Sequence, residues 1–171
     1  MAEQVPGVCS AIDRISIATG RAAAWLTLAM VIVSFVIVVM RYAFDSGLIW
    51  LQESLTWMHA AVFMLGVAYT LQRDEHVRVD IFYRTMSEKR RAWVDLLGVI
   101  FFVFPLGIFF IFESFDYVAA AWTISEVSRE SGGLPYPSVP LLKSALLVMP
   151  AAVLLQGLSM ALRAVAGIRA R

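Results

Sequence analysis

Residues 41–83 read RYAFDSGLIWLQESLTWMHAAVFMLGVAYTLQRDEHVRVDIFY, and this stretch decides the fold. It opens with a polar loop that ends at Trp50, continues through a mostly apolar segment, and ends in a charged segment around His76. A polar entry, an apolar crossing of about 20 residues and a charged exit are typical of a membrane-spanning helix. The stretch therefore predicts one crossing of a lipid bilayer together with the loops that flank it.

The composition of the whole chain indicates the same environment. Of its 171 residues 60% are hydrophobic and only 16% are charged, with a mean hydropathy of +0.77. Soluble domains have about 45–50% apolar and about 25% charged residues. The net charge of +1 gives no argument for nucleic-acid binding. Because the stretches outside the apolar segments are shorter than the roughly 50 residues of a separate domain, we expect one membrane domain over 1–171.

Four apolar stretches are long enough to cross the roughly 30 Å hydrocarbon core of a bilayer. We therefore expect an all-α integral membrane protein with four transmembrane helices and short interfacial helices. The expected spans are 22–40, 51–71, 94–117 and 139–162. The expected connectors are a cytoplasmic one, 72–93, and two periplasmic ones, 41–50 and 118–138.

Several local features refine this prediction. Residues 1–21 have one weakly apolar helix face, which predicts a helix lying on the membrane surface. Residues 79–86 predict a second interfacial helix, ended before Ser87, which can cap the helix that follows. In the third span we expect Trp93 and Trp122 at the two membrane interfaces, and Pro105 predicts a kink.

The distribution of Lys and Arg predicts the orientation. Eleven of these residues lie in the N-terminal segment, the central connector and the C-terminal tail, against three in or beside the other two connectors. Because positive charge accumulates in cytoplasmic loops, both termini and the central connector are expected in the cytoplasm.

Few polar residues near the spans are candidates for a site. Glu53, at the start of the second span, is either an interface residue in contact with water or a salt-bridge partner of another protein, and Trp50 and Trp57 lie within about one turn of it. Glu113 and Asp116 share a helix face near the outer end of the third span, and we expect Lys143 to pair with them. Gln156, deep in the fourth span, is interpreted as a residue that holds helices together.

We expect no catalytic residue, no cofactor and no bound metal. His59 and His76 are 17 residues apart, about 25 Å along a helix, so one haem plane cannot hold both. His59 is interpreted as a packing residue and His76 as a connector residue or a partner contact. The single Cys9 has no second cysteine for a disulfide or metal site.

The order of several short motifs resembles the small membrane subunit (DctQ type) of TRAP transporters, the tripartite ATP-independent periplasmic family. These motifs are Arg41-Tyr42-Ala43-Phe44, then Trp50 and Glu53, Leu65-Gly66-Val67-Ala68, His76-Val77-Arg78-Val79-Asp80, Ser131-Gly132-Gly133-Leu134-Pro135, Leu142-Lys143-Ser144 and Leu155-Gln156-Gly157. One departure concerns the position before the second span, where several relatives have two adjacent acids and this chain has Gln52-Glu53.

The resemblance implies a function and partners. It implies a scaffold without a transport site in the bacterial inner membrane, bound to a large TRAP membrane subunit that holds the substrate and sodium sites. A periplasmic substrate-binding protein would dock on this pair, and a sodium gradient would drive uptake of an organic acid. Six residues are then candidates for a partner contact or a structural role: Trp50, Glu53 and Trp57, and His76, Arg78 and Asp80 in the connector.

Two other functions remain open. One is a self-sufficient four-helix transporter, which requires a deep carboxylate that residues 22–40 lack. The other is a membrane anchor for a redox enzyme. The chain lacks motifs for phosphate binding or nucleophilic catalysis, which favours a scaffold over an enzyme.

Overall fold

The computed structural model describes residues 7–73, 83 and 85–169, and most of them are helical. The helices are α1 (Gly7–Ala43), α2 (Ile49–Gln72), α4 (Glu88–Gly98), the π-helical turn η1 (Val99–Val103), α5 (Phe104–Thr123) and α6 (Ser138–Arg169). Because α4, η1 and α5 follow one another without a break, the described chain has four helices that are long and apolar enough to cross a membrane. The predicted all-α membrane fold with four spans is confirmed.

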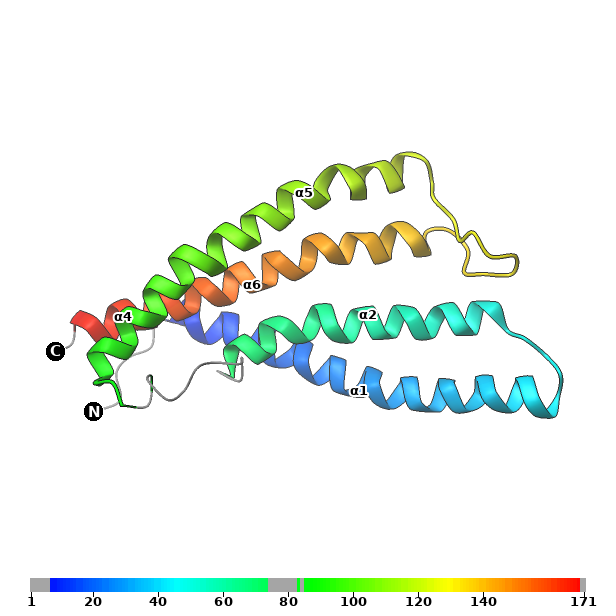
Figure 1. Ribbon diagram of the computed structural model, residues 1–171, viewed down its shortest axis with the longest axis horizontal. Helices are drawn as coiled ribbons and strands as arrows, with labels where there is room; N and C mark the ends of the chain where they lie inside the picture. Colours follow the sequence, from blue (N-terminus) through cyan, green and yellow to red (C-terminus); the bar gives the residue numbers. More distant parts are fainter. Residues whose placement is uncertain (1–6, 74–82, 84, 170–171) are drawn as a thin grey trace.

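The four long helices run alternately in opposite directions (Figure 1). The loops 44–48 and 124–137 lie at one end of the molecule, here called the loop end. Gly7, the start of α4 and Arg169 lie at the opposite end, here called the terminal end. Each expected span lies within one of these helices, while the position of the lipid boundary and the side that faces the cytoplasm stay predictions.

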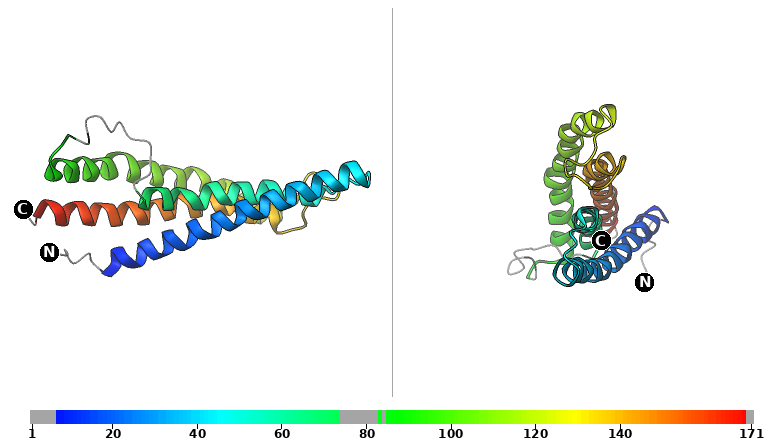
Figure 2. Two further views of the ribbon diagram at one scale, coloured as in Figure 1. Left: turned by 90° about the horizontal axis from the view of Figure 1, so that it is seen from below. Right: turned by 90° about the vertical axis from the view of Figure 1, so that its right-hand side faces the viewer.

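Helix α6 is the centre of the arrangement. It packs against α1, α2, α4 and α5, and α1 and α2 pack against each other along their length. By contrast α2 and α5 lie on opposite sides of α6 and share no extended contact. Viewed from the loop end, the helices form an open arrangement rather than a closed four-helix bundle (Figure 2).

Small residues allow the helices to approach closely. A methyl group at Gly20 of α1 would overlap the ring of Tyr69 on α2. On the other side of α6, a Cβ at Gly107 would lie 2.7 Å from Leu154 Cδ2. Because lipid is as apolar as a leucine side chain, such close packing is a main source of helix association in membranes.

The N-terminal segment differs from the expectation for residues 1–21. From Gly7 onward the chain is the first part of α1 and not a separate surface helix. Cys9, Ile12 and Ser16 on this part are buried. The prediction was wrong for the described residues because the polar side chains of this segment have partners on α6, which the sequence of the segment alone does not reveal.

Pro105 is accommodated by the π-helical turn η1, which directly precedes α5. Proline has no N–H group, and its ring displaces the carbonyl group four residues earlier, here that of Phe101 within η1. A π turn inserts one extra residue and relieves this conflict without ending the helix. Pro150 lies inside α6, which also continues through it.

The outer surface of the described chain is strongly apolar. Large side chains such as Trp25, Phe35 and Phe112 are 72%, 69% and 75% exposed. In a soluble protein such exposure would drive association, whereas lipid covers it in a membrane. Trp93 and Trp122 are also exposed near the two ends of the third span, where they are expected to meet the membrane interfaces.

Two smaller predictions concern the region before α4. The expected interfacial helix over 79–86 falls mostly outside the described residues. Ser87 does occupy the N-cap position of α4, but its side chain makes no capping hydrogen bond. Its backbone carbonyl accepts the N–H of Arg91 at 3.0 Å instead.

Candidate functional site

Glu53 fastens the connector 124–137 to helix α2 at the loop end. Its carboxylate accepts a hydrogen bond from the Ser128 hydroxyl group and a second one, at 2.6 Å, from the backbone N–H of Leu134. The two donors belong to the same connector but approach different carboxylate oxygens. A half-buried carboxylate that accepts two hydrogen bonds therefore holds the connector before and after the glycine pair 132–133.

The Gly132-Gly133 pair in this connector has a physical role at each position. Gly132 has a φ of 81°, a backbone conformation that residues with a Cβ adopt at a cost. At Gly133 a Cβ would lie 2.7 Å from Glu53 Oε2 and would overlap the Ser128 hydroxyl group. The second glycine is therefore required for the chain to pass close to the carboxylate.

Lys143 fastens the same connector to the start of α6. Its ammonium group forms an ion pair with Glu126 at 2.6 Å, and both side chains are largely buried. The ammonium group also lies 3.9 Å from the centroid of the Tyr117 ring on α5, which adds a cation–π contact. Lys143 thus joins the connector, α5 and α6.

A third attachment comes from Trp122 at the end of α5. Its indole N–H donates to the Ser144 hydroxyl oxygen at 3.0 Å, and its ring meets the Tyr136 ring edge-on. A cavity of about 300 Å³ remains between α2, the connector and α6, and Trp57 lies in its wall. We define Glu53, Glu126, Ser128, Leu134 and Lys143 as the loop-end cluster.

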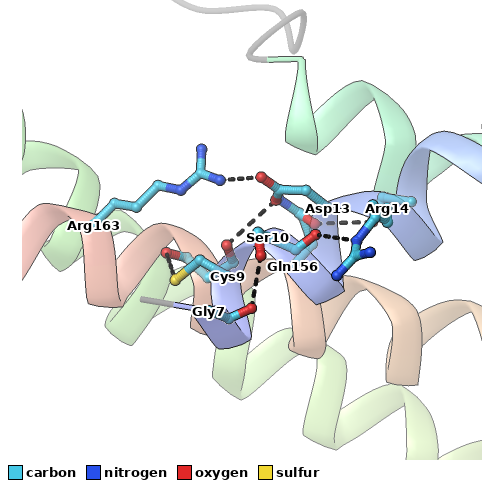
Figure 3. A network of polar contacts seen from close by, with 9 residues as sticks. Gly7, Cys9, Ser10, Asp13, Arg14, Gln156 and Arg163 are labelled. Atoms are coloured by element: carbon cyan, nitrogen blue, oxygen red, sulfur yellow. Dashed lines mark hydrogen bonds and ion pairs between the residues drawn. The ribbon is translucent and has the colours of Figure 1, made fainter. Parts of the chain in front are cut away.

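A second polar cluster joins α1 to α6 near the terminal end (Figure 3). Asp13 Oδ1 accepts hydrogen bonds from Gln156 Nε2 at 3.2 Å and from the Ser159 hydroxyl group at 3.4 Å. Its other oxygen forms an ion pair with Arg163. Ser16 donates to Gln156 Oε1 at 2.9 Å, so both ends of the buried Gln156 amide are satisfied.

Cys9 extends this cluster by a weak bond. Its thiol lies 3.8 Å from the carbonyl oxygen of Ser159, and the side chain is fully buried. We define Cys9, Asp13, Ser16, Gln156, Ser159 and Arg163 as the terminal-end cluster. Because its buried polar groups are mutually bonded, the cluster stabilises one relative position of α1 and α6. The interpretation of Gln156 as a residue that holds helices together is confirmed.

The structure places the predicted site residues in different ways. Glu53 and Trp57 both line the cavity at the loop end. Trp50, in the first turn of α2, is 49% exposed. Their role as partner contacts stays a prediction. His76, Arg78 and Asp80 lie outside the described residues.

Lys143 has a partner that the sequence analysis did not single out. Its ion pair is with Glu126 in the connector, which replaces the expected pairing with Glu113 and Asp116. Both of these acids are exposed on α5. The connector folds back over the start of α6, and this brings an acid to Lys143 that helix spacing alone cannot place.

The residues of the terminal-end cluster have a regular spacing in the sequence that could have predicted the cluster. Gln156, Ser159 and Arg163 are spaced at i, i+3 and i+7, and Cys9, Asp13 and Ser16 at i, i+4 and i+7. Each set shares one helix face. A polar stripe on the first helix and another on the last predict that the two faces meet, and this comparison would have identified the cluster.

Neither cluster has the geometry of a catalytic or metal site. In the part of the chain that the structure describes, no group of three or more His, Cys, Asp or Glu side chains could hold a metal ion. His59 lies on the exposed side of α2 and contacts the Phe63 ring edge-on at 4.7 Å. What the two clusters do is fix helices and a connector.

The fold and the two clusters define a small multi-pass helical membrane protein in which the clustered polar groups serve its own packing. Residues 30–167 match the family model for the DctQ component of tripartite ATP-independent periplasmic transporters. This match covers most of the chain, so the chain belongs to the DctQ family of TRAP transporter components.

One relative shows how far the similarity to a single protein extends. It is the C4-dicarboxylate TRAP transporter small permease protein DctQ of Vibrio cholerae serotype O1, which is 28% identical over 71 residues. The alignment covers 42% of this chain and 31% of the relative. No solved structure matches the chain.

Proposed function

We propose that this chain is the non-catalytic scaffold subunit of a sodium-driven, binding-protein-dependent TRAP transporter that imports an organic acid. The observation that carries the proposal is the family match over residues 30–167, which includes the last part of α1, all of α2, α4 and α5, and nearly all of α6. In this assignment a large TRAP membrane subunit holds the transport site. A periplasmic substrate-binding protein delivers the solute to the pair of membrane subunits.

The described polar contacts support a structural role. The buried hydrogen bonds of Ser16, Gln156 and Ser159 join α1 to α6, and the bonds of Glu53 fix a connector. A transport site requires ionisable or polar groups that are free to bind a solute or an ion near the middle of the membrane. These groups already have partners within the chain, which favours a fixed scaffold.

The orientation follows from the charge count. We place the protein in the bacterial inner membrane with both termini and the connector 72–93 in the cytoplasm. The loop end, with the loop-end cluster, then faces the periplasm. This is the side from which a binding protein would approach.

Reconstitution in proteoliposomes tests the scaffold function. Three preparations are compared under an inward sodium gradient. They contain the chain alone, the chain with a large TRAP subunit and binding protein from the same organism, or these two partners without the chain. Labelled succinate is the first probe, because the Vibrio cholerae relative is named for C4-dicarboxylates, and other organic acids follow. We expect uptake only in the complete mixture and its loss when the sodium gradient is removed.

Three other results of these experiments would point to a different function. Uptake by the chain alone would contradict the scaffold function and indicate a self-sufficient transporter. Full uptake without the chain would show that it is dispensable for transport. A haem or flavin band in the visible spectrum of the purified chain would instead indicate the anchor of a redox enzyme.

A further inference from the structure

An apolar groove lies between α2 and α5, over one side of α6. The two helices that border it share no extended contact, and Figure 1 shows them on opposite sides of α6. A cavity of about 370 Å³ lies in this groove. Its walls are almost entirely apolar and include Val67, Leu71, Phe102, Leu106, Phe110 and Pro150.

Glu113 lies on the same face of α5 as the residues that line the groove, nearer the loop end. Leu106 and Phe110 line the groove. Glu113 and Tyr117 follow Leu106 by seven and eleven residues, so all four side chains lie on one face of the helix. Tyr117 in turn lies against Lys143 of α6. The groove therefore has an apolar part near the middle of the molecule and an acidic position farther out.

The depth of Glu113 makes this acid unusual. It lies nine residues before Trp122, which is about 13 Å along the helix. With Trp122 at the membrane interface and a headgroup layer of about 6 Å, Glu113 lies about 7 Å inside the hydrocarbon region. A carboxylate at such a depth is costly unless a cation or strong donor meets it.

The described chain does not supply that partner. Across residues 7–73 and 85–169, Glu113 is exposed and is in none of the ion pairs or hydrogen bonds. Lys143, the nearest cation suggested by the sequence, is held by Glu126. A cation or strong donor from another molecule would therefore supply the partner that the described residues do not.

We infer that this groove receives a transmembrane helix of the larger membrane subunit, and that a Lys or Arg on this helix pairs with Glu113. Lipid tails fill an apolar groove but offer no cation at this depth. A protein segment at membrane depth against an apolar wall must be helical, because lipid cannot satisfy its backbone groups. A second copy of this chain related by two-fold symmetry would bring a second Glu113 to this face and not a cation. The identity of the partner rests on the proposed function.

Photo-crosslinking tests where the helix binds. A photoreactive phenylalanine analogue replaces Phe110 in the groove or Phe112 on another face of α5, two residues away and at nearly the same depth. Phe112 is the more exposed of the two, at 75% against 41%. Exposure alone therefore predicts more crosslinking at Phe112. We expect the complex with the large subunit to crosslink from position 110, and the crosslinked peptide to belong to a transmembrane helix with a Lys or Arg.

Charge substitution tests the role of Glu113. In E113K the introduced cation meets the partner's cation, so co-purification of the large subunit should fall at least about tenfold. F112K introduces the same cation one residue away on a different face and serves as the control, with co-purification near the wild-type level. Exchange of the partner's basic residue for Glu should restore co-purification with E113K.

The outcomes separate the inference from the proposed function. If the wild-type chain co-purifies with the large subunit but crosslinks to it from position 112 and not 110, the inference is overturned and the function stands. Crosslinks from position 110 to phospholipid or to a second copy also overturn the inference. A wild-type chain that retains no large subunit overturns both.

Discussion

Glu53 shows how a single carboxylate at a membrane interface can have a structural use. Sequence reasoning left two explanations, contact with water or a salt bridge to another protein. A structural role was the alternative to a partner contact, and in the structure both carboxylate oxygens accept hydrogen bonds from the connector 124–137 of the same chain. The neighbouring position is Gln52. One acid is sufficient for the two bonds observed.

Substitution of Glu53 should release the connector in a graded way. E53A removes both acceptors, so the Leu134 N–H should exchange with solvent deuterium at least about tenfold faster, as expected for the loss of about 1.5 kcal/mol of charge-assisted bonding. E53Q keeps one carbonyl oxygen for the Leu134 N–H, and the Ser128 hydroxyl group can accept from its amide. Hydrogen exchange of the protein in detergent measures both. Equal exchange in E53A and the wild type would contradict this role.

The same contact predicts that Gly133 does not tolerate a side chain. G133A places a methyl group against Glu53 Oε2 and Ser128, so the connector must shift and the free energy of unfolding should fall by about 1–3 kcal/mol. G47A is the matched control, since a Cβ at Gly47 in the other loop at this end has open space around it. Thermal unfolding in detergent compares the two variants. A loss of stability in both would show a general sensitivity of this end.

At the scale of elements, α1 and α6 depend on the terminal-end cluster. D13A leaves the buried Gln156 amide and Ser159 hydroxyl groups without their acceptor, which should lower the free energy of unfolding by about 1–3 kcal/mol. D13N keeps an acceptor and loses only the ion pair with Arg163, which is 41% exposed, so its effect should be smaller. R14A, at the next and exposed position, is the control. Unfolding by SDS in mixed micelles provides the measurement.

Much of the element structure could be predicted from the sequence, because hydrophobic length alone identifies a spanning helix. The course of α1 before residue 22 could not be predicted from the segment itself. Its mixed composition resembles a surface helix, and only the complementary polar stripe on α6 explains why it packs inside. The partner of Lys143 was missed for a related reason, since Glu126 lies in the irregular turn after α5, where Ser125 has a positive φ and the Glu126 N–H bonds to the Ala121 carbonyl oxygen.

The π turn η1 is another element that hydrophobicity does not reveal. Pro105 indicates a disturbance of the helix, but a kink and a π turn are both compatible with it. Val103 lies so close to α6 that a Cβ at Gly157 would approach it to 2.9 Å, and Val99 is 1% exposed. The turn is thus held against α6 on its buried side.

At the scale of the whole molecule, the alternating helices place both loops at one end. The orientation proposed from the charge count predicts which side a reagent can reach. In a C9S background, single cysteines at Gly47 and Ser131 should react with a membrane-impermeant maleimide in intact spheroplasts. A cysteine at Ser87 should react only after the membrane is permeabilised. Each of these three positions is exposed, so accessibility within the fold does not decide the result. The reverse pattern would invert the orientation.

The central place of α6 also has a consequence for biosynthesis. It is the last of the four long helices to leave the ribosome, yet it supplies one side of the terminal-end cluster, the Lys143 attachment and the main contacts of α5. Until it enters the membrane, the α1–α2 hairpin and the α4–α5 helix have no extended contact with each other. Assembly therefore cannot proceed span by span during translation. A chain truncated before residue 138 keeps only the Glu53 contacts to the connector between its two helical parts, and it should be degraded by membrane proteases rather than persist as a partly working subunit.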